Sequence, residues 1–154
     1  MENKELFALG LGLERPWRIK SIELESTKAE KGTLHIYLDY KKGSKFEYEG
    51  SNYSVYDHHD RTWQHLNFFE HKCYLHARVP RIKTEEGKVK LVRVPWAGKG
   101  SSFSYKFEAD IIDLISKNMS ATAAGKRYNI GSQTVFRIIR KYVSHALALS
   151  LIHI

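Results

Sequence analysis

Cysteine, proline, long apolar runs and late acidic residues are all scarce in this 154-residue chain. The single cysteine, Cys73, excludes an internal disulfide framework and fits a reducing compartment. No apolar run is long enough to span a bilayer. The opening MENKELFALGLGLERPW is acidic and interrupted by glycine, unlike a signal peptide. The sequence therefore predicts a cytoplasmic protein without a membrane partner.

Acidic residues stop altogether at Asp113. The charges beyond it are all cationic: Lys117, Lys126, Arg127, Arg137, Arg140 and Lys141. The whole chain carries a formal net charge of +8, with a sequence pI near 9.5. This balance favours a polyanionic partner, most simply nucleic acid. A one-signed segment with helical periodicity indicates a binding surface more than an ordinary solvated face.

The first two-thirds of the chain predicts a short helix followed by strands. Residues 3–10 have the helical pattern and end at glycine. Apolar and polar residues alternate over 18–26 and 33–40, which predicts a β-hairpin, and again over 62–70, 72–82 and 89–96. Residues 41–60 are turn-rich and show no clear period. We expect a small antiparallel β domain over residues 1–96, followed by a linker at 97–102, AGKGSS.

Beyond the linker the hydrophobic period becomes helical. Three helices are predicted, over 104–118, 121–128 and 132–143, with Ser120 as the N-cap of the second. A helix, a short helix, a tight turn and a helix form the trihelical helix-turn-helix arrangement, which we place at 103–145. The fold class is therefore α+β. Residues 146–154 form a tail, and LSLIHI at its end resembles translated adapter sequence, so its last residues are not expected to be native.

Three residues match the chemistry that a helix-turn-helix needs. Gly125 is the small residue where two helices touch, Asn129 tolerates the left-handed conformation of the turn, and Ile130 is the buried aliphatic after it. The third helix then carries side chains suited to base edges, with Phe136 beside them, and to phosphates. The predicted DNA-binding residues are Ser132, Gln133, Thr134, Arg137, Arg140, Lys141, Lys126 and Arg127. The alternative is a helical hairpin with a basic surface.

These segments resemble a known family of proteins. TWQHLNFFEHKCYLHARVPR, VPWAGKGSSF and the helix-turn-helix are similar to the amino-terminal part of the ISL3 family of bacterial insertion-sequence transposases. The resemblance implies a small zinc-binding β domain, then a helix-turn-helix that recognises the terminal inverted repeats of the element. It also implies a downstream catalytic domain with an acidic metal-binding triad.

The resemblance implies zinc ligands on both sides of the central hairpin. They are a Cys-x-x-Cys pair before it and a Cys-x-x-Cys or Cys-x-x-His pair after it. The resemblance places these positions at Tyr48 and Ser51, and at Thr84 and Gly87. None of the four is a plausible structural zinc ligand. We therefore expect a zinc-ribbon-like domain whose ligands are lost, with no cofactor in this chain.

A cluster of histidines raises an alternative metal site. His58, His59, His65, His71 and His76 lie with Cys73 within residues 56–80. Alternation along strands allows a three-ligand group, but no spacing matches a closed site. The favoured roles are packing for Cys73 and surface or DNA-backbone contacts for the imidazoles. Trp63, Phe68, Phe69 and Tyr74 are predicted to form the core of the hairpin.

The favoured function is a DNA-binding, non-catalytic fragment of a transposase, which ends before the acidic triad of the family. No convergent set of carboxylates suggests a two-metal site, so we expect no enzymatic activity from this chain. Its partner is predicted to be the double-stranded DNA of transposon ends, with oligomerisation possible in the full-length protein. Two alternatives remain open. One is an autonomous helix-turn-helix transcriptional regulator, and the other is a small hydrolase that uses the histidine cluster.

Overall fold

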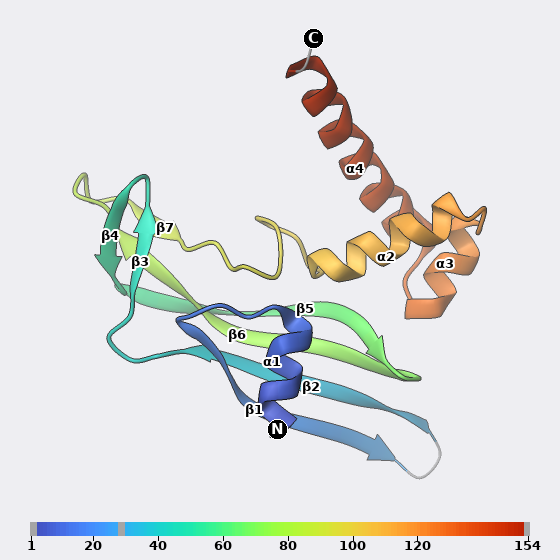
Figure 1. Cartoon of the computed structure of the whole chain (residues 1–154), viewed down its shortest axis with the longest axis horizontal. Helices are drawn as coiled ribbons and strands as arrows, with labels where there is room; N and C mark the ends of the chain where they lie inside the picture. The colour runs from blue at the N-terminus through green and yellow to red at the C-terminus, as the bar shows by residue number, and fades with distance from the viewer. Residues whose placement is uncertain (1–2, 28–29, 153–154) are drawn as a thin grey trace. The chain divides into compact units, whose positions relative to one another are not determined.

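The computed structural model describes residues 3–27 and 30–152, which divide into two compact units (Figure 1). Unit 1 extends to Tyr105, and unit 2 begins at Lys106. The chain is a mixed α+β protein, as predicted. No described helix has the length and apolar character needed to cross a membrane.

The described part of unit 1 contains one helix and seven strands. In chain order they are α1 (Asn3–Leu11), β1 (Trp17–Thr27), β2 (Glu30–Tyr40), β3 (Lys45–Tyr48), β4 (Ser51–Ser54), β5 (Asp57–Phe68), β6 (His71–Lys83) and β7 (Val89–Leu91). The predicted first hairpin is confirmed as β1 and β2. The two strand-like runs beside Glu70 and His71 are confirmed as β5 and β6. The predicted third strand, 89–96, was too long, because only Val89–Leu91 pairs with β6.

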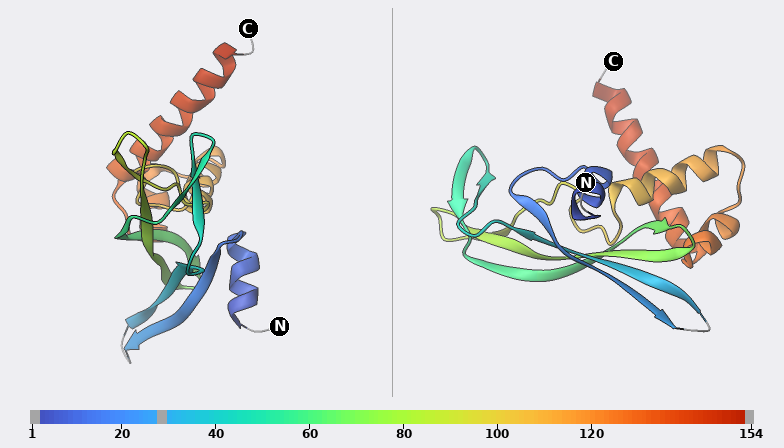
Figure 2. Two further views of the ribbon diagram at one scale, coloured as in Figure 1. Left: turned by 90° about the vertical axis from the view of Figure 1, so that its left-hand side faces the viewer. Right: turned by 60° about the horizontal axis from the view of Figure 1, so that its bottom comes forward.

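The main sheet has the order β1-β2-β6-β5, and β7 pairs with the end of β6. The prediction of a wholly antiparallel domain was wrong, because β2 and β6 run parallel. Between them the chain forms the β3–β4 hairpin and then β5, which returns it so that β6 follows the direction of β2. Helix α1 lies along β1 on one face of this sheet (Figure 2).

The β3–β4 hairpin lies in the stretch that has no clear sequence period. Each strand has only four residues, which is too short for alternation to be evident. The turn between them is formed by Glu49 and Gly50, both with positive φ, at 49° and 83°. Two successive left-handed residues give the tight turn that matches the natural twist of paired strands.

The core of unit 1 lies on the face of the sheet that α1 partly covers. Leu34, Ile36 and Leu75 are almost fully buried there, and Cys73 is buried beside them as expected. Two residues were wrongly predicted to be in this core. Phe69 is 85% exposed because it forms the β5–β6 turn with a φ of 54°, and Tyr74 lies on the opposite face against the ring of His35.

The segment predicted to be a linker is attached to unit 1. The backbone N–H of Gln64 donates to Ser102, and that of Ser104 donates to Gln64, at 2.9 and 3.0 Å. The indole of Trp96, just before the segment, packs against Trp17 and Trp63 with ring centroids 4.8 and 5.3 Å apart. We call residues 92–104 the strap. It follows β7 and is held against the sheet along its length.

The described residues of unit 2 form three helices. These are α2 (Tyr105–Ser116), α3 (Ala121–Tyr128) and α4 (Ser132–Ile152). Each helix has a buried face: Phe107, Ile111 and Leu114 on α2, Ala124 and Tyr128 on α3, and Val135 and Ile138 on α4. The predicted cap is confirmed, because the hydroxyl of Ser120 accepts from the N–H of Ala123 at 3.1 Å. Helix α4 continues through the predicted tail as far as Ile152.

Candidate nucleic-acid interface

A tight turn fixes the crossing of α3 and α4. Asn129 ends α3 in the left-handed conformation, with φ 57° and ψ 44°, as its sequence position predicts. The next residue, Ile130, donates its backbone N–H to the carbonyl oxygen of Gly125 at 2.9 Å. Helix α4 then begins at Ser132, so only three residues separate the two helices. A short connection of this kind leaves little freedom in the direction of the second helix.

Gly125 is required at the point where the turn approaches α3. A Cβ atom on this residue would lie 2.4 Å from the backbone oxygen of Ile130 and 3.5 Å from the side chain of Val135. The first distance is far below van der Waals contact, and a backbone atom cannot easily move away. The predicted small-residue position is therefore confirmed as a direct helix-to-turn contact.

A buried aromatic contact joins α3 to α2. The rings of Tyr128 and Phe107 lie 4.5 Å apart, and the Tyr128 hydroxyl donates to the carboxylate of Asp110. Burial and this carboxylate both raise the pKa of the Tyr128 hydroxyl, so it stays protonated and can donate. The role of Asp110 was not evident from the sequence, where it reads only as an exposed charge on the amphipathic helix.

Helix α4 separates its apolar and polar residues in its first three turns. Val135 and Ile138 face the core of unit 2, while Gln133, Arg137 and Arg140 are exposed. Phe136, on the exposed side, has half of its surface accessible to solvent. Within the described part of the chain, Gln133, Arg137 and Arg140 make no ion pair or side-chain hydrogen bond. They are therefore available for contacts with a partner.

Not all of the predicted DNA-binding residues have the same environment. Ser132 and Thr134 are half-buried at the start of α4, whereas Lys126 and Arg127 are exposed at the end of α3. The Lys141 ammonium lies 3.0 and 3.1 Å from the two carboxylate oxygens of Glu108, a residue of α2. Lys141 therefore joins α4 to α2. No local pattern indicates this contact, because the two residues are 33 positions apart.

The histidines of unit 1 make separate structural contacts. His65 lies opposite Cys73 in the strand register, but its Nδ1 is 2.6 Å from the hydroxyl of Ser104. His71 accepts the backbone N–H of Gly32 on its Nδ1, at 2.9 Å. Among the residues described, no three His, Cys, Asp or Glu side chains converge as a metal site would require. Burial raises the pKa of the Cys73 thiol to about 12, which disfavours the thiolate.

His76 and His35 form a pair on the face of the sheet opposite α1. His35 Nδ1 and His76 Nε2 are 2.8 Å apart, so one of these nitrogens carries the shared proton. The other nitrogen of His76 lies 3.0 Å from the Thr62 hydroxyl, and that of His35 lies 3.1 Å from Glu25. One assignment satisfies all three contacts with neutral rings, in which His76 donates from Nε2 and His35 donates from its own Nε2 to Glu25.

Two sequence comparisons connect this arrangement to known proteins. Residues 92–143 match the helix-turn-helix domain of transposase family ISL3, and residues 50–84 match the zinc-finger of transposases IS204, IS1001, IS1096 and IS1165. The chain is an ISL3-type transposase amino-terminal region. The first match includes the strap, α2, α3 and α4 as far as Val143, and the second includes β4, β5 and β6.

Curated relatives of this ISL3-type region support the same assignment. The chain is 27% identical over 146 residues to proteins named "Transposase for insertion sequence element IS1557", from two strains of Mycobacterium tuberculosis. The aligned region covers 92% of this chain and 33% of each relative, so the chain spans about a third of their length. No solved structure matches this chain.

The positions that the resemblance assigns to zinc ligands lie in two turns at one end of unit 1 (Figures 1 and 2). Tyr48 and Ser51 face each other across the β3–β4 turn. In the β6–β7 turn, Thr84 uses its hydroxyl to accept the N–H of Lys88 at 3.1 Å. Gly87 has a φ of 83°, a conformation that would strain a cysteine. These four residues provide neither thiolate nor imidazole, so they do not fit a structural zinc ion.

Proposed function

We propose that this chain is the DNA-recognition region of an insertion-sequence transposase and that it binds the terminal inverted repeats of its element. In this proposal α3 and α4 form the helix-turn-helix, and α4 is the helix that enters the major groove. The single observation that carries the proposal is the α3–α4 turn. The contact of Gly125 with Ile130 and the left-handed Asn129 fix α4 so that its first turns present polar side chains to the outside.

The exposed side chains of α4 have the chemistry of base recognition. Gln133 can pair with adenine, Arg137 can pair with guanine, and the exposed ring of Phe136 can contact a thymine methyl group. Ser132 and Thr134 lie at the start of the helix, where base edges are closest. Arg140, Lys126 and Arg127 are placed to contact backbone phosphates.

Lys141 has a different role in this proposal. Its ammonium is already paired with Glu108, whose side chain is only 14% exposed. A cation held by a protein carboxylate releases few counterions when DNA binds. We therefore infer that Lys141 positions α4 against α2 and contributes less to phosphate binding than Arg140 does.

Several finer features belong to the proposal. The chain is inferred to bind DNA without cleaving it, because the described residues hold no convergent group of acidic ligands. Instead, its carboxylates are used one at a time, as in the pairs of Asp57 with Arg81 and of Asp113 with Lys117. Unit 1 is inferred to fold without zinc. Any strand transfer would depend on other parts of a full-length transposase.

The test is a binding titration of α4 variants on a duplex with the cognate end sequence and on a scrambled duplex. Gln133→Ala and Arg137→Ala should each weaken cognate binding by about 1–3 kcal/mol and reduce the preference for the cognate duplex. Arg140→Ala should weaken binding to both duplexes alike. It should also reduce the slope of log Kd against log salt concentration by about one.

The matched control is Lys117→Ala, which removes a cation that is paired with Asp113 on α2. It should change neither sequence preference nor salt slope appreciably. The assignment of α4 is rejected if Gln133→Ala, Arg137→Ala and Arg140→Ala all behave like this control.

A further inference from the structure

Unit 1 has a cleft that the proposed helix-turn-helix does not use. It has a volume of about 720 Å³ and lies between β3, β5, β7 and the strap. Four cationic side chains line it: Arg61, Lys90, Arg93 and Lys99. We call this cavity the basic cleft. Two carboxylates, Glu47 and Glu49, lie on the β3 side, so the lining has a net positive charge.

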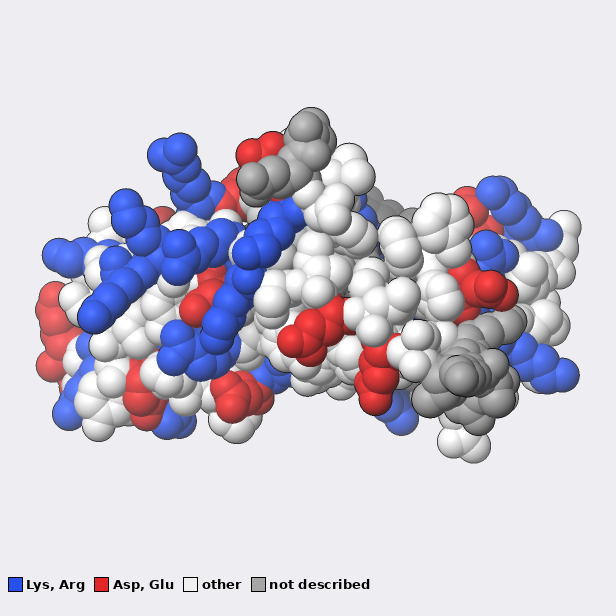
Figure 3. Space-filling view, turned by 90° about the horizontal axis from the view of Figure 1, so that it is seen from below, with Lys and Arg blue, Asp and Glu red and all other residues white. Residues whose placement is uncertain are grey.

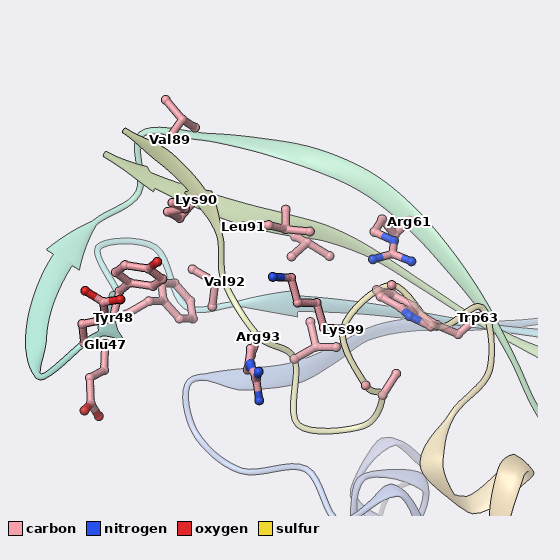
Figure 4. Close-up of a pocket in the computed structure, with 17 residues that line it drawn as sticks. Glu47, Tyr48, Arg61, Trp63, Val89, Lys90, Leu91, Val92, Arg93 and Lys99 are labelled. Atoms are coloured by element: carbon pink, nitrogen blue, oxygen red, sulfur yellow. The ribbon is translucent and has the colours of Figure 1, made fainter. Parts of the chain in front are cut away.

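The cations of the basic cleft come from three separate segments of chain. Arg61 is on β5, Lys90 is on β7, and both Arg93 and Lys99 are on the strap. Figure 4 shows Lys99 extending across the space beneath β7, with Arg61 above the ring of Trp63. The Arg61 guanidinium is 5.4 Å from the Trp63 ring centroid and donates to the Ser101 carbonyl at 3.1 Å.

The strap holds its cations in fixed positions. Val92 donates its N–H to Pro80 at 3.0 Å, and Trp96 accepts the N–H of Tyr105 at 2.8 Å. Between Arg93 and Lys99, Trp96 and Ala97 are buried. Side chains carried by an anchored backbone lose less conformational freedom when they bind a ligand. This anchoring favours a binding role over a flexible, solvated loop.

The cations at this end of unit 1 have few partners within the protein. Lys90, Arg93 and Lys99 are exposed and make no ion pair among the described residues. The same holds for other cations near the start of β1, the end of β2 and β3: Arg18, Lys20, Lys41, Lys42 and Lys45. Figure 3 shows Lys and Arg side chains gathered over the end of unit 1 that carries β3, β4 and β7. Asp39 and Asp57 are paired with Arg78 and Arg81, whereas Glu47 and Glu49 of the cleft lining make no ion pair among the described residues.

We propose that the basic cleft binds the phosphodiester backbone of duplex DNA as a second, sequence-independent contact. A small anion would be bound by an enclosed site with buried donors, whereas these ammonium and guanidinium groups are open to solvent. They also continue beyond the cleft along the same end of the unit. Repeated, unpaired cations along an open surface match an extended polyanion. The inference rests on the proposal that the chain binds DNA.

The test compares two double variants of the full chain that remove equal charge. Lys90→Gln with Lys99→Gln changes the basic cleft, while Lys4→Gln with Lys72→Gln changes the opposite end of unit 1. Binding is titrated at several salt concentrations on cognate and scrambled duplexes. The cleft pair should weaken binding to both duplexes about tenfold and lower the salt slope by about two, since each phosphate contact contributes about 0.9. The control pair should keep a slope close to that of the unmodified chain.

The outcomes separate this inference from the α4 assignment. If the double variant of the basic cleft has the same salt slope as the control double variant, the proposal that the basic cleft binds DNA is rejected. This holds whatever the α4 variants show. A cleft pair that loses slope supports it, even if Gln133→Ala and Arg137→Ala leave sequence preference unchanged and so reject α4. A chain that binds no duplex at low salt overturns both. Thermal unfolding of each variant checks that the fold is retained, and Arg61 is left intact because it packs on Trp63.

Discussion

Six of the eight histidines lie in unit 1. Several of them form hydrogen bonds with groups on neighbouring strands, with a hydroxyl or with a carboxylate. Unit 2 presents its polar residues differently. The first turns of α4 expose Gln133, Arg137 and Arg140 with no partner among the described residues. The histidine-rich stretch therefore has mainly structural contacts. The polar side chains without partners among the described residues lie on an ordinary amphipathic helix, to which we assign recognition only as a proposal.

This difference teaches how to weigh residue type against environment. A histidine that faces a neighbouring strand can place its ring nitrogens against that strand's side chains, as His76 does with His35 and Thr62. Pairing within the sheet therefore removes those side chains from a binding role. On α4 the side chains of Gln133, Arg137 and Arg140 face solvent and not a neighbouring strand, so they remain available. Judged by residue type alone, the histidines of unit 1 would be better candidates for a binding site than the polar residues of α4.

The largest effect should come from breaking the α3–α4 turn. Gly125→Ala places a methyl group against the Ile130 carbonyl, so we expect unit 2 to lose about 1–3 kcal/mol of stability. The exposed positions of Gln133, Arg137 and Arg140 on α4 depend on this contact. DNA affinity should therefore fall in proportion to the fraction of unit 2 that is folded. Chemical denaturation followed by circular dichroism, together with DNA titration, measures both.

Gly131→Ala is the matched control for this change. Nothing lies within 4 Å of a Cβ atom at Gly131, and its φ is not in the left-handed region. Stability should change by less than about 0.5 kcal/mol. Equal losses of stability at Gly125 and Gly131 would show that the approach of Ile130 to Gly125 does not fix α4. The exposed residues of α4 could then not be contrasted with the paired histidines of unit 1.

The sequence predicted the helices of unit 2 well because their signals are local. Ser120, Gly125 and Asn129 each act within a few residues of their own position, through a cap, a contact and a turn. The topology of unit 1 was not predictable in the same way. The parallel pairing of β2 with β6 joins Leu34 to Cys73 across the intervening hairpin and β5, and no local pattern encodes such a partner.

The candidate site shows the same limit. Amphipathic spacing placed Gln133 and Arg137 on the exposed side of α4, as the structure has them. It did not reveal that Lys141 is held by Glu108, or that Lys99 belongs to a cleft. Both depend on residues brought together over long sequence distances. A glycine- and serine-containing stretch therefore resembled a linker although its backbone pairs with β5.

A smaller effect should come from the histidine pair of unit 1. Burial and the neighbouring His35 both lower the pKa of His76 below 6.5, and Glu23 opposes them. A histidine with a depressed folded pKa favours the neutral ring in the folded state. Its contribution to stability is complete above pH 6.5 and is lost as pH falls from there through the folded pKa. We expect the melting temperature of unit 1 to decrease between pH 7.5 and 5.5.

His76→Gln should reduce this pH dependence, because it removes the ring that must take up the proton. His59→Gln is the control, since His59 is exposed and makes no side-chain contact among the described residues. Melting curves at half-unit pH steps provide the comparison. A pH dependence that His76→Gln leaves unchanged would assign the effect to other groups and weaken the view that these imidazoles are structural.

The smallest expected effect is that of zinc removal. In zinc-dependent domains metal binding supplies folding free energy, and a chelator unfolds them. In unit 1 the positions that the resemblance assigns to zinc ligands hold Tyr48, Ser51, Thr84 and Gly87. The packing of Trp17, Trp63 and Trp96 joins the strands to the strap instead. We therefore expect elemental analysis to give far less than one zinc per chain. EDTA should leave the melting temperature of unit 1 unchanged within error. Adding zinc after EDTA treatment is the control, and it should not raise the melting temperature. About one zinc per chain, with unfolding on chelation, would show that unit 1 binds metal through other residues, and its histidines would then have to be reconsidered as ligands.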